Sequence, residues 1–191
     1  FEAPLVRRMG EGVKECLVYL PAYVTLKSLE IGVDEGSVIK AAPSPFKHKI
    51  VFIGSSLTHG EANPRPSAIY VAQLGRRLNM ETPNLGHSGQ CKMQPQFLEF
   101  LKTCEADAFV FDAFSNPSEK QIKERLNNFV EKLVKAHPGK PLIFIQSPID
   151  QDSDFDTKKY ARRLNHVATV SKMMKALAKQ YKDVYFLEVP N

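Results

Sequence analysis

The chain has 191 residues, of which 43% are hydrophobic and 25% are charged, and its formal net charge is +5. This length and composition are typical of one sizeable globular domain, and no apolar run approaches the ~20 residues that a membrane-spanning helix needs. Nucleic-acid binding is not expected, because the basic residues are mixed with acidic ones and no basic run contains interleaved aromatic residues.

The first element in chain order is an N-terminal segment, residues 1–45, which is predicted to be β-rich. Cys16 to Val33 is rich in Val, Leu, Ile and Tyr, contains Pro21 and ends in a turn-like stretch at 34–37, a pattern that favours strands without a helix. Residues 41–45, Ala-Ala-Pro-Ser-Pro, suit a short stiff linker. A segment of this size cannot bury a core alone. We therefore expect it to pack on the main domain or to end a preceding accessory β-domain.

Residues 46–191 are predicted to form an α/β domain in which strands and helices alternate. The expected strands are 50–53, one ending at 84–85, 108–111, 142–145 and 184–187, and the expected helices are 68–78, 94–101, one from Pro117 to a stop at 137–139, and one that includes 160–181. Five strands that alternate with helices indicate a parallel sheet with helices on both faces. The predicted fold class is a three-layer α/β/α, flavodoxin-like domain.

Functional groups of such sheets gather in the loops after the carboxyl ends of the strands. The first loop, residues 54–60, reads Gly-Ser-Ser-Leu-Thr-His-Gly, and its glycines allow a tight turn from which a hydroxyl can project. The second loop, residues 84–89, reads Asn-Leu-Gly-His-Ser-Gly and offers backbone N–H groups to an oxyanion. The third loop, residues 112–117, contains Asn116, whose amide is another potential donor.

Each loop taken alone has an ordinary structural interpretation. Serines and glycines are common in turns. Asn116 is also a good N-cap for the following helix, with Pro117 at the first helical position and Glu119 completing a capping box. The three loops together are more informative, because they would meet at one edge of the sheet. Acyl transfer needs a nucleophile and oxyanion donors in one place.

The three loops resemble the sequence blocks of the SGNH hydrolases, the superfamily of GDSL-like lipases and acylhydrolases. Residues 53–60 are similar to its first block, with Ser55 where many members have Asp, and residues 84–89 resemble its second block. Asn116 matches the asparagine of the third block, although its neighbours depart from the common Gly-x-Asn-Asp. The resemblance implies that Ser56 is the nucleophile of a serine esterase. It also implies that the N–H groups of Ser56 and Gly89 and the side-chain amide of Asn116 form the oxyanion hole.

The resemblance extends from Lys49 to about Leu187, and it implies a general base that this sequence does not contain. The family takes its base from an Asp-x-x-His block after the fifth strand. The five histidines are poor substitutes: His48 precedes the first strand, His59 would have to fold back within a tight turn, His87 is at best an outside alternative, His137 lies at a helix end, and His166 is expected on a solvated helix face. We expect the block to follow Asn191; the alternative is a protein that lacks the base. Catalysis without a triad member is slight.

The predicted function is cleavage of carboxylic esters through an acyl-enzyme, including acetyl or acyl groups on carbohydrate. The alternative is a non-catalytic flavodoxin-like domain that binds a small anion or another ligand. No cofactor or metal is expected, because nucleotide-binding loops and metal-ligand spacings are missing. The expected partner is a small-molecule or carbohydrate ester, with no nucleic acid and no membrane span, and the sequence indicates no oligomeric state. The three cysteines, Cys16, Cys91 and Cys104, are expected to be free and mostly buried.

The compartment is inferred only indirectly. Acylhydrolases of this subgroup are often exported in bacteria, and they often carry a β-rich domain before the catalytic one. The first residue is Phe1 rather than Met, which fits removal of a signal peptide and fits trimming equally well. We therefore expect a periplasmic or secreted protein of bacterial origin.

Overall fold

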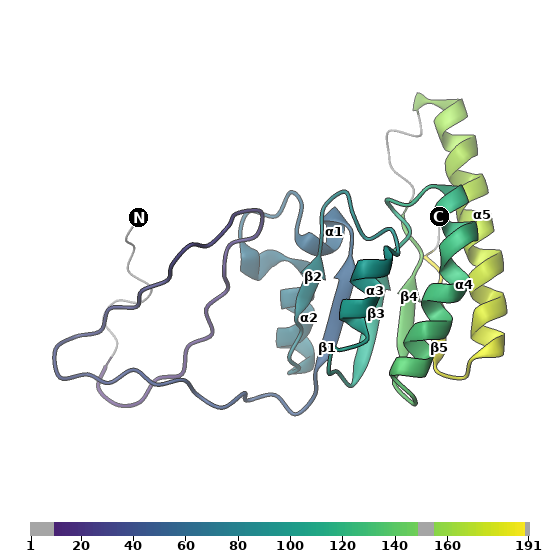
Figure 1. Cartoon of the computed structure of the whole chain (residues 1–191). Helices are drawn as coiled ribbons and strands as arrows, with labels where there is room; N and C mark the ends of the chain where they lie inside the picture. Colours follow the sequence, from purple (N-terminus) through teal and green to yellow (C-terminus); the bar gives the residue numbers. More distant parts are fainter. Residues whose placement is uncertain (1–9, 149–154, 190–191) are drawn as a thin grey trace.

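The computed structural model describes residues 10–148 and 155–189 (Figure 1). The elements are β1 (Ile50–Gly54), α1 (Ser56–His59), the 3-10 turn η1 (Pro66–Ala68), α2 (Tyr70–Leu78), β2 (Asn84–Gly86), α3 (Pro95–Leu101), β3 (Ala108–Asp112), α4 (Glu119–Ala136), β4 (Leu142–Ile145), α5 (Thr157–Gln180) and β5 (Val184–Leu187). All five predicted strands are present, so the predicted alternation of strands and helices is confirmed.

The five strands form one sheet in the order β2-β1-β3-β4-β5, and every pairing is parallel. This confirms the predicted α/β fold class. In the register of the sheet, Gly54 at the end of β1 lies beside both Gly86 of β2 and Asp112 of β3. From β1 the chain forms β2 on one side and then β3 on the other. Ligands of such sheets bind where the strand order reverses in this way, outside the carboxyl ends of the strands.

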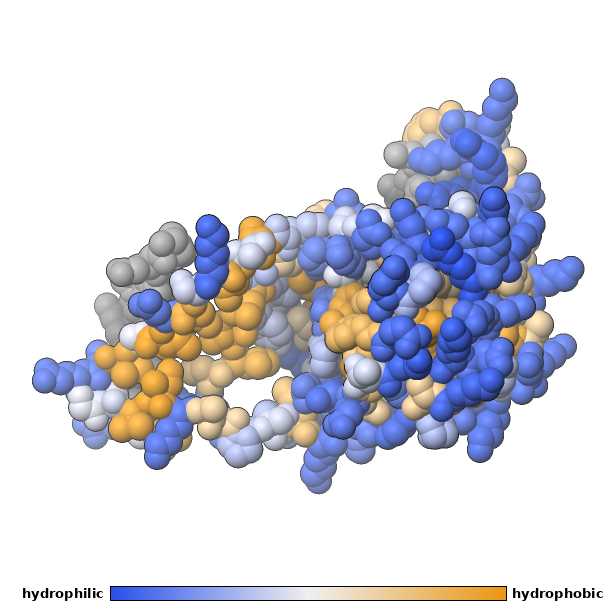
Figure 2. All heavy atoms as spheres, in the orientation of Figure 1, coloured by the Kyte–Doolittle hydropathy of each residue, from blue (hydrophilic) through white to orange (hydrophobic). Residues whose placement is uncertain are grey.

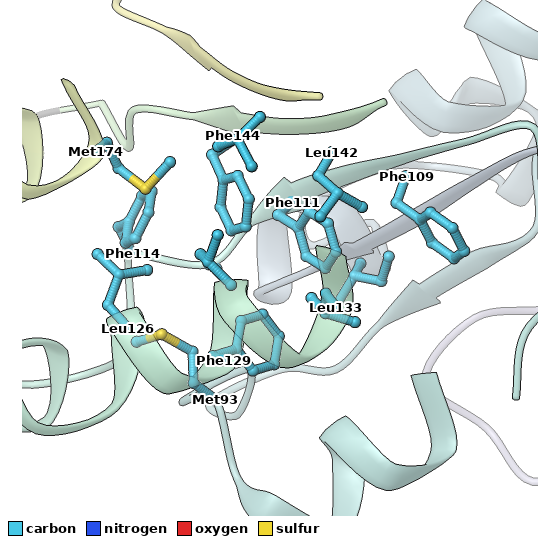
Figure 3. Packing of buried hydrophobic residues seen from close by; sticks show 14 of the residues in the cluster. Met93, Phe109, Phe111, Phe114, Leu126, Phe129, Leu133, Leu142, Phe144 and Met174 are labelled. Carbon is cyan, nitrogen blue, oxygen red and sulfur yellow. The ribbon is translucent and has the colours of Figure 1, made fainter. Parts of the chain in front are cut away.

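The core is built on both faces of the sheet because strand side chains alternate between them. On one face Phe109, Phe111 and Phe144 pack against α4 and α5, as Figure 3 shows. The ring of Phe111 stacks on Phe144, with 4.5 Å between centroids, and meets Phe129 of α4 edge-on. On the other face Phe52 and Val110 pack with residues of α2. Burying each large side chain contributes about 1.5–3 kcal/mol, and this holds the strand ends in register.

The N-terminal segment corrects one prediction. Residues 10–48 contain turns and bends but no strand or helix, and Figure 1 shows them as a long irregular excursion from the sheet. A strand needs a hydrogen-bonded neighbour, and the nearby edge strand β2 is three residues long. Most apolar side chains of the segment are exposed, including Val13, Val24 and Val38. Figure 2 shows hydrophobic residues, in orange, at the surface of this part of the chain. The assignment of residues 1–45 to an accessory β-domain stays a prediction.

The segment touches the main domain near residues 19–23. The hydroxyl of Tyr19 accepts a hydrogen bond from Arg76 of α2, at 3.2 Å, and the Arg76 guanidinium lies over the Tyr19 ring. Ala22 packs against the apolar cluster on the α2 face of the sheet. A cleft of about 290 Å³ lies between residues 19–22, α2 and β2. The segment therefore covers part of the β2 edge of the sheet.

Candidate active site

The first loop places two adjacent serines in different environments. Ser55 is the N-cap of α1; its hydroxyl accepts a hydrogen bond from the Leu57 N–H and donates one, at 2.6 Å, to Asp112. Ser55 is 1% exposed, whereas Ser56 is half-buried. The hydroxyl and the N–H of Ser56 make no hydrogen bond to any residue that the structure describes, as expected for the first N–H of a helix. Ser55 is thus structural, and Ser56 is available for chemistry.

Glycine is required at two strand ends because the loops pack directly on one another. A Cβ on Gly54 would collide with the Thr58 hydroxyl and would lie 2.9 Å from the Cβ of Asp112. A Cβ on Gly86 would collide with the backbone of His59. The turn after β1 therefore packs closely against β2 and β3, with no room for a side chain at Gly54 or Gly86.

Asp112 connects the first loop to the third loop through hydrogen bonds. It is 7% exposed, and its Oδ2 accepts hydrogen bonds from the Ser55 N–H at 3.2 Å, the Ser55 hydroxyl at 2.6 Å and the Thr58 hydroxyl at 3.1 Å. Its Oδ1 accepts from the Ser115 hydroxyl at 3.3 Å. Hydrogen bonds to a carboxylate are about twice as strong as neutral ones, so Asp112 fixes the turn that carries Ser56.

Tyr70 supports the same turn from helix α2. Its hydroxyl lies 2.9 Å from the Thr58 hydroxyl. Because the Thr58 proton goes to Asp112, the Tyr70 hydroxyl is the donor in this pair. Burial raises the pKa of Tyr70 to about 12, and the nearby Asp112 charge also raises it. Tyr70 therefore stays protonated and keeps donating.

The second loop is tied to the first by hydrogen bonds. The Asn84 side chain donates to the Thr58 carbonyl at 2.7 Å, and the His87 N–H donates to the Gly54 carbonyl at 2.9 Å. Gly89 is exposed and has φ +70°, a conformation that favours glycine. Its N–H makes no hydrogen bond within residues 10–148 and 155–189, so this donor is free to bind an oxyanion.

The third loop corrects the predicted helix cap. Helix α4 begins at Glu119, its N-cap is Ser118, and Ser118 forms a capping box with Gln121. Asn116 does not cap the helix. Its Nδ2 donates instead to the Gln90 carbonyl, at 2.7 Å, and this contact holds it in the site. Both Asn116 and Ser118 have a suitable partner three residues later, so the sequence left two starts possible.

The structure thus brings together the loops of all three predicted residues. Asn116 contacts Gln90, the residue after Gly89, and the loops of Gly89 and Ser56 share hydrogen bonds. An amide nitrogen carries two protons, so Asn116 keeps one N–H for another acceptor. The catalytic roles of Ser56, Gly89 and Asn116 stay predictions.

None of the five histidines, all of which are described, hydrogen-bonds to the Ser56 hydroxyl. His137 is buried and donates to the Leu101 carbonyl at 2.9 Å. His166 was predicted to be solvated, but it is half-buried and donates to the Phe114 carbonyl at 2.8 Å. The prediction is wrong because this side of α5 contacts the loop after β3.

His59 lies three residues after Ser56 in the same one-turn helix, but its side chain contacts other residues. Its Nδ1 accepts a weak hydrogen bond from the Ser88 N–H at 3.4 Å. Burial, together with the charge of His87, lowers the pKa of His59 below 6.5. The ring stacks on Tyr23 of the N-terminal segment, and the Tyr23 hydroxyl donates to the Ser56 carbonyl at 3.3 Å.

Tyr23, Asp112 and Arg125 were not assigned roles from the sequence. Tyr23 hydrogen-bonds to the Ser56 carbonyl, and the guanidinium of Arg125 on α4 donates to the Lys92 carbonyl. Both contacts join residues that are 33 positions apart, so no local pattern reveals them. A sequence signal did exist for Asp112, since an acid that ends a buried strand needs hydrogen-bond partners. Across the described residues, no cluster of three or more metal-binding side chains occurs, and no helix is long and apolar enough to cross a membrane.

Comparison with known proteins identifies related sequences and folds. The model of the GDSL-like lipase/acylhydrolase family matches residues 47–191. A protein from Bacteroides ovatus ATCC 8483, provisionally assigned as a GDSL-like lipase, is 34% identical, with a TM-score of 0.77 over 83% of this chain and 47% of that chain. This chain therefore spans about half the length of that relative. No curated protein sequence matches it.

Two further solved structures share the fold. A salicylyl-acyltransferase from a tetracycline biosynthetic pathway is 18% identical, with a TM-score of 0.65 over 78% of this chain and 44% of that one. A family two carbohydrate esterase from Clostridium thermocellum is 18% identical, with a TM-score of 0.56 over 79% of this chain and 56% of that one. At this identity the likeness is one of fold alone.

Proposed function

The chain belongs to the GDSL-like lipase/acylhydrolase family, and we propose that it is a serine ester hydrolase in which Ser56 is the nucleophile. The observation that carries the proposal is the contrast between the two serines. Asp112 and the Leu57 N–H engage the Ser55 hydroxyl, while the hydroxyl and N–H of Ser56 are both unpaired among the described residues.

In the proposed reaction, the Ser56 Oγ attacks the carbonyl carbon of an ester, and its proton passes to a general base. The carbonyl oxygen becomes an oxyanion that accepts hydrogen bonds from the N–H groups of Ser56 and Gly89 and from the second N–H of Asn116. Each such donor is worth about 3 kcal/mol of transition-state stabilisation. Collapse of the intermediate expels the alcohol, which takes the proton from the base, and water then hydrolyses the acyl-enzyme.

The general base of the proposal is the histidine of the Asp-x-x-His block that the family resemblance implies. That block does not occur between Phe1 and Asn191, and none of the five histidines of this chain hydrogen-bonds to the Ser56 hydroxyl. Activity is therefore to be measured on the full-length protein.

The finer proposal is that the ester is an acetyl or another acyl group on a carbohydrate. His87 and Gln90 are exposed close to Gly89 of the proposed oxyanion hole, and polar surroundings of this kind suit a polar, hydroxyl-rich leaving group better than a long lipid.

A fluorophosphonate probe tests the proposal, because it forms a covalent bond only with an activated serine. We expect the full-length protein to be labelled and Ser56→Ala to lose all labelling. Ser28→Ala is the matched control, since Ser28 is exposed and distant in sequence from the three loops; it should label normally. A full-length protein that is inert both to the probe and to p-nitrophenyl acetate would contradict the proposal and favour the ligand-binding alternative.

A further inference from the structure

The backbone between Gly89 and Met93 has an unusual conformation. Gly89, Cys91 and Met93, at alternate positions, have φ values of +70°, +59° and +54°. A positive φ is easy for glycine but uncommon and costly for a residue with a side chain. Strained backbone of this kind persists only where its surroundings hold it, and it concentrates at functional sites.

Buried side chains hold this loop from one side. Cys91 is 6% exposed and Met93 is 4% exposed, and both belong to the main core cluster. Their burial anchors the loop by its side chains, but it does not fix the directions of the peptide groups between them.

Two side-chain donors fix those peptide groups. The Asn116 amide donates to the Gln90 carbonyl at 2.7 Å, and the Arg125 guanidinium of α4 donates through Nη1 to the Lys92 carbonyl at 2.9 Å. The carbonyls of the two residues that separate the left-handed positions are thus both held by side chains from the β3–α4 region. Gly89 lies directly before this clamped stretch.

Arg125 makes its polar contact with the backbone of this loop and not with an acidic side chain. It is half-buried in the second turn of α4, and it forms no ion pair with any acidic residue that the structure describes. Its recorded hydrogen bond is the one to Lys92. Its polar contact is thus with the backbone of the loop after Gly89, and replacement of Arg125 would remove that contact.

We propose that Arg125 is a positioning residue for the oxyanion hole. It holds residues 89–93 so that the Gly89 N–H is directed toward the reacting carbonyl. The inference rests on the proposed function. Donors of an oxyanion hole act because they are aimed before the charge develops, and a loop with three left-handed residues would lose that aim without its clamp. Arg125 does not itself contact the substrate.

The test compares Arg125→Met and Arg125→Lys with Arg77→Met in the full-length protein. Arg77 is an exposed arginine on α2 whose side chain makes no hydrogen bond or ion pair with the described residues. We expect Arg125→Met to lower kcat for p-nitrophenyl acetate by about 10- to 100-fold, somewhat less than the loss of a whole donor, with KM within about twofold of wild type. The fluorophosphonate labelling rate should fall in parallel, and Arg125→Lys, which keeps a donor, should retain more kcat.

Chemical rescue separates positioning from general loss of stability. Low, non-denaturing guanidinium chloride should restore part of the kcat of Arg125→Ala, because the free cation can occupy the vacated site and donate to Lys92. In a merely destabilised variant the same salt would lower activity further. Amide exchange of residues 89–93 should also accelerate in Arg125→Met and stay unchanged in Arg77→Met.

The outcomes distinguish the two proposals. If wild type is labelled by the probe and Arg125→Met keeps its kcat, the Arg125 inference is overturned and the esterase proposal stands. If Arg125→Met does not fold, guanidinium rescue of Arg125→Ala decides, and an alanine variant whose kcat the added salt does not raise overturns the inference. If wild type itself is inert to the probe, both proposals are overturned.

Discussion

The ring of Tyr23 lies flat on the ring of His59, with 3.8 Å between the centroids and 18° between the planes. Tyr23 belongs to the N-terminal segment, whereas His59 is the last residue of the one-turn helix that begins with Ser56. The contact therefore joins a largely exposed segment to the turn that carries the proposed nucleophile, and it is reinforced by the hydrogen bond from the Tyr23 hydroxyl to the Ser56 carbonyl.

Removal of the Tyr23 ring should raise the pKa of His59. Burial is the main cause of the lowered value, and Tyr23→Ala exposes one face of the imidazole. We expect the His59 ring resonances in an NMR titration to move their midpoint toward 6.5, the value of an unperturbed histidine. Tyr19→Ala is the control, because Tyr19 contacts Arg76 instead. An unchanged His59 midpoint in Tyr23→Ala would show that the stacking does not shield the ring.

The lowered pKa of His59 also makes the stability of the protein depend on pH. The folded protein binds the His59 proton less tightly than the unfolded chain, so acidification below about 6.5 favours unfolding. The His59 contribution to stability begins to fall as the pH drops to the pKa of His59 in the unfolded chain. It is fully lost below the pKa of His59 in the folded protein. In Tyr23→Ala the two values lie closer together, so the His59 contribution to acid destabilisation should shrink. Denaturant unfolding between pH 7 and pH 5, with Tyr19→Ala alongside, measures the difference.

Replacement of Asp112 by asparagine should weaken both the fold and the site. The carboxylate accepts three hydrogen bonds on Oδ2, and the amide cannot accept all of them with the same strength. We expect Asp112→Asn to lower the free energy of unfolding by about 2 kcal/mol and the labelling rate of Ser56 by about tenfold, a loss of ~1.4 kcal/mol. The control is Asp107→Asn, an exposed acid whose ion pairs should be worth less than ~1 kcal/mol. Equal effects of the two variants would contradict a special role for Asp112.

Three glycine variants should separate backbone strain from steric overlap. Gly89→Ala places a Cβ in open space but at φ +70°, so we expect a loss of about 1 kcal/mol in stability and a lower kcat. Gly139→Ala, at φ +75° and also in open space, carries the same backbone cost at the end of α4 and should leave kcat unchanged. Gly54→Ala collides with Thr58 and Asp112 and should cost about 3 kcal/mol. If Gly139→Ala lowered kcat as much as Gly89→Ala, the loss would reflect stability alone.

The cysteines should react with iodoacetamide in the order of their exposure. Cys16 is exposed, Cys104 is half-buried, and Cys91 is 6% exposed. Burial, together with the charge of Asp112, raises the pKa of the Cys91 thiol to about 12, so at pH 8 almost none of it is the reactive thiolate. Peptide mass spectrometry should find Cys16 alkylated first and Cys91 only after unfolding. Rapid alkylation of Cys91 in the folded protein would contradict the prediction and would mean that the loop of residues 89–93 opens in solution.

Local patterns were sufficient for the sheet. The apolar runs at 50–53 and 108–111 are buried strands, because a continuous apolar run between turns has few other stable conformations. The start of α4 was less certain, since Asn116 and Ser118 offer equivalent capping chemistry. The choice depends on whether Asn116 has a better acceptor, and that acceptor, Gln90, lies 26 residues away.

Longer-range effects account for what the sequence analysis missed. The strands expected between Cys16 and Val33 have no hydrogen-bonded neighbour in the structure, and strand propensity alone does not replace one. The contacts of Asp112 with Ser55 and of Arg125 with Lys92 depend on strand register and helix placement. The family blocks identified the three loops but not the residues that hold them.

The hydrogen bonds of the site run mainly between loops. Asp112 of β3 holds Ser55, Asn84 holds Thr58, and Asn116 holds Gln90. A protein engineer who grafted one of these loops from a relative would import donors without their acceptors. A change of substrate preference is therefore more readily reached by exchanging all three loops as a set, or by altering the exposed rim and leaving the connecting residues intact. Natural variation in this family faces the same constraint, and it predicts that residues at such cross-loop contacts change in concert.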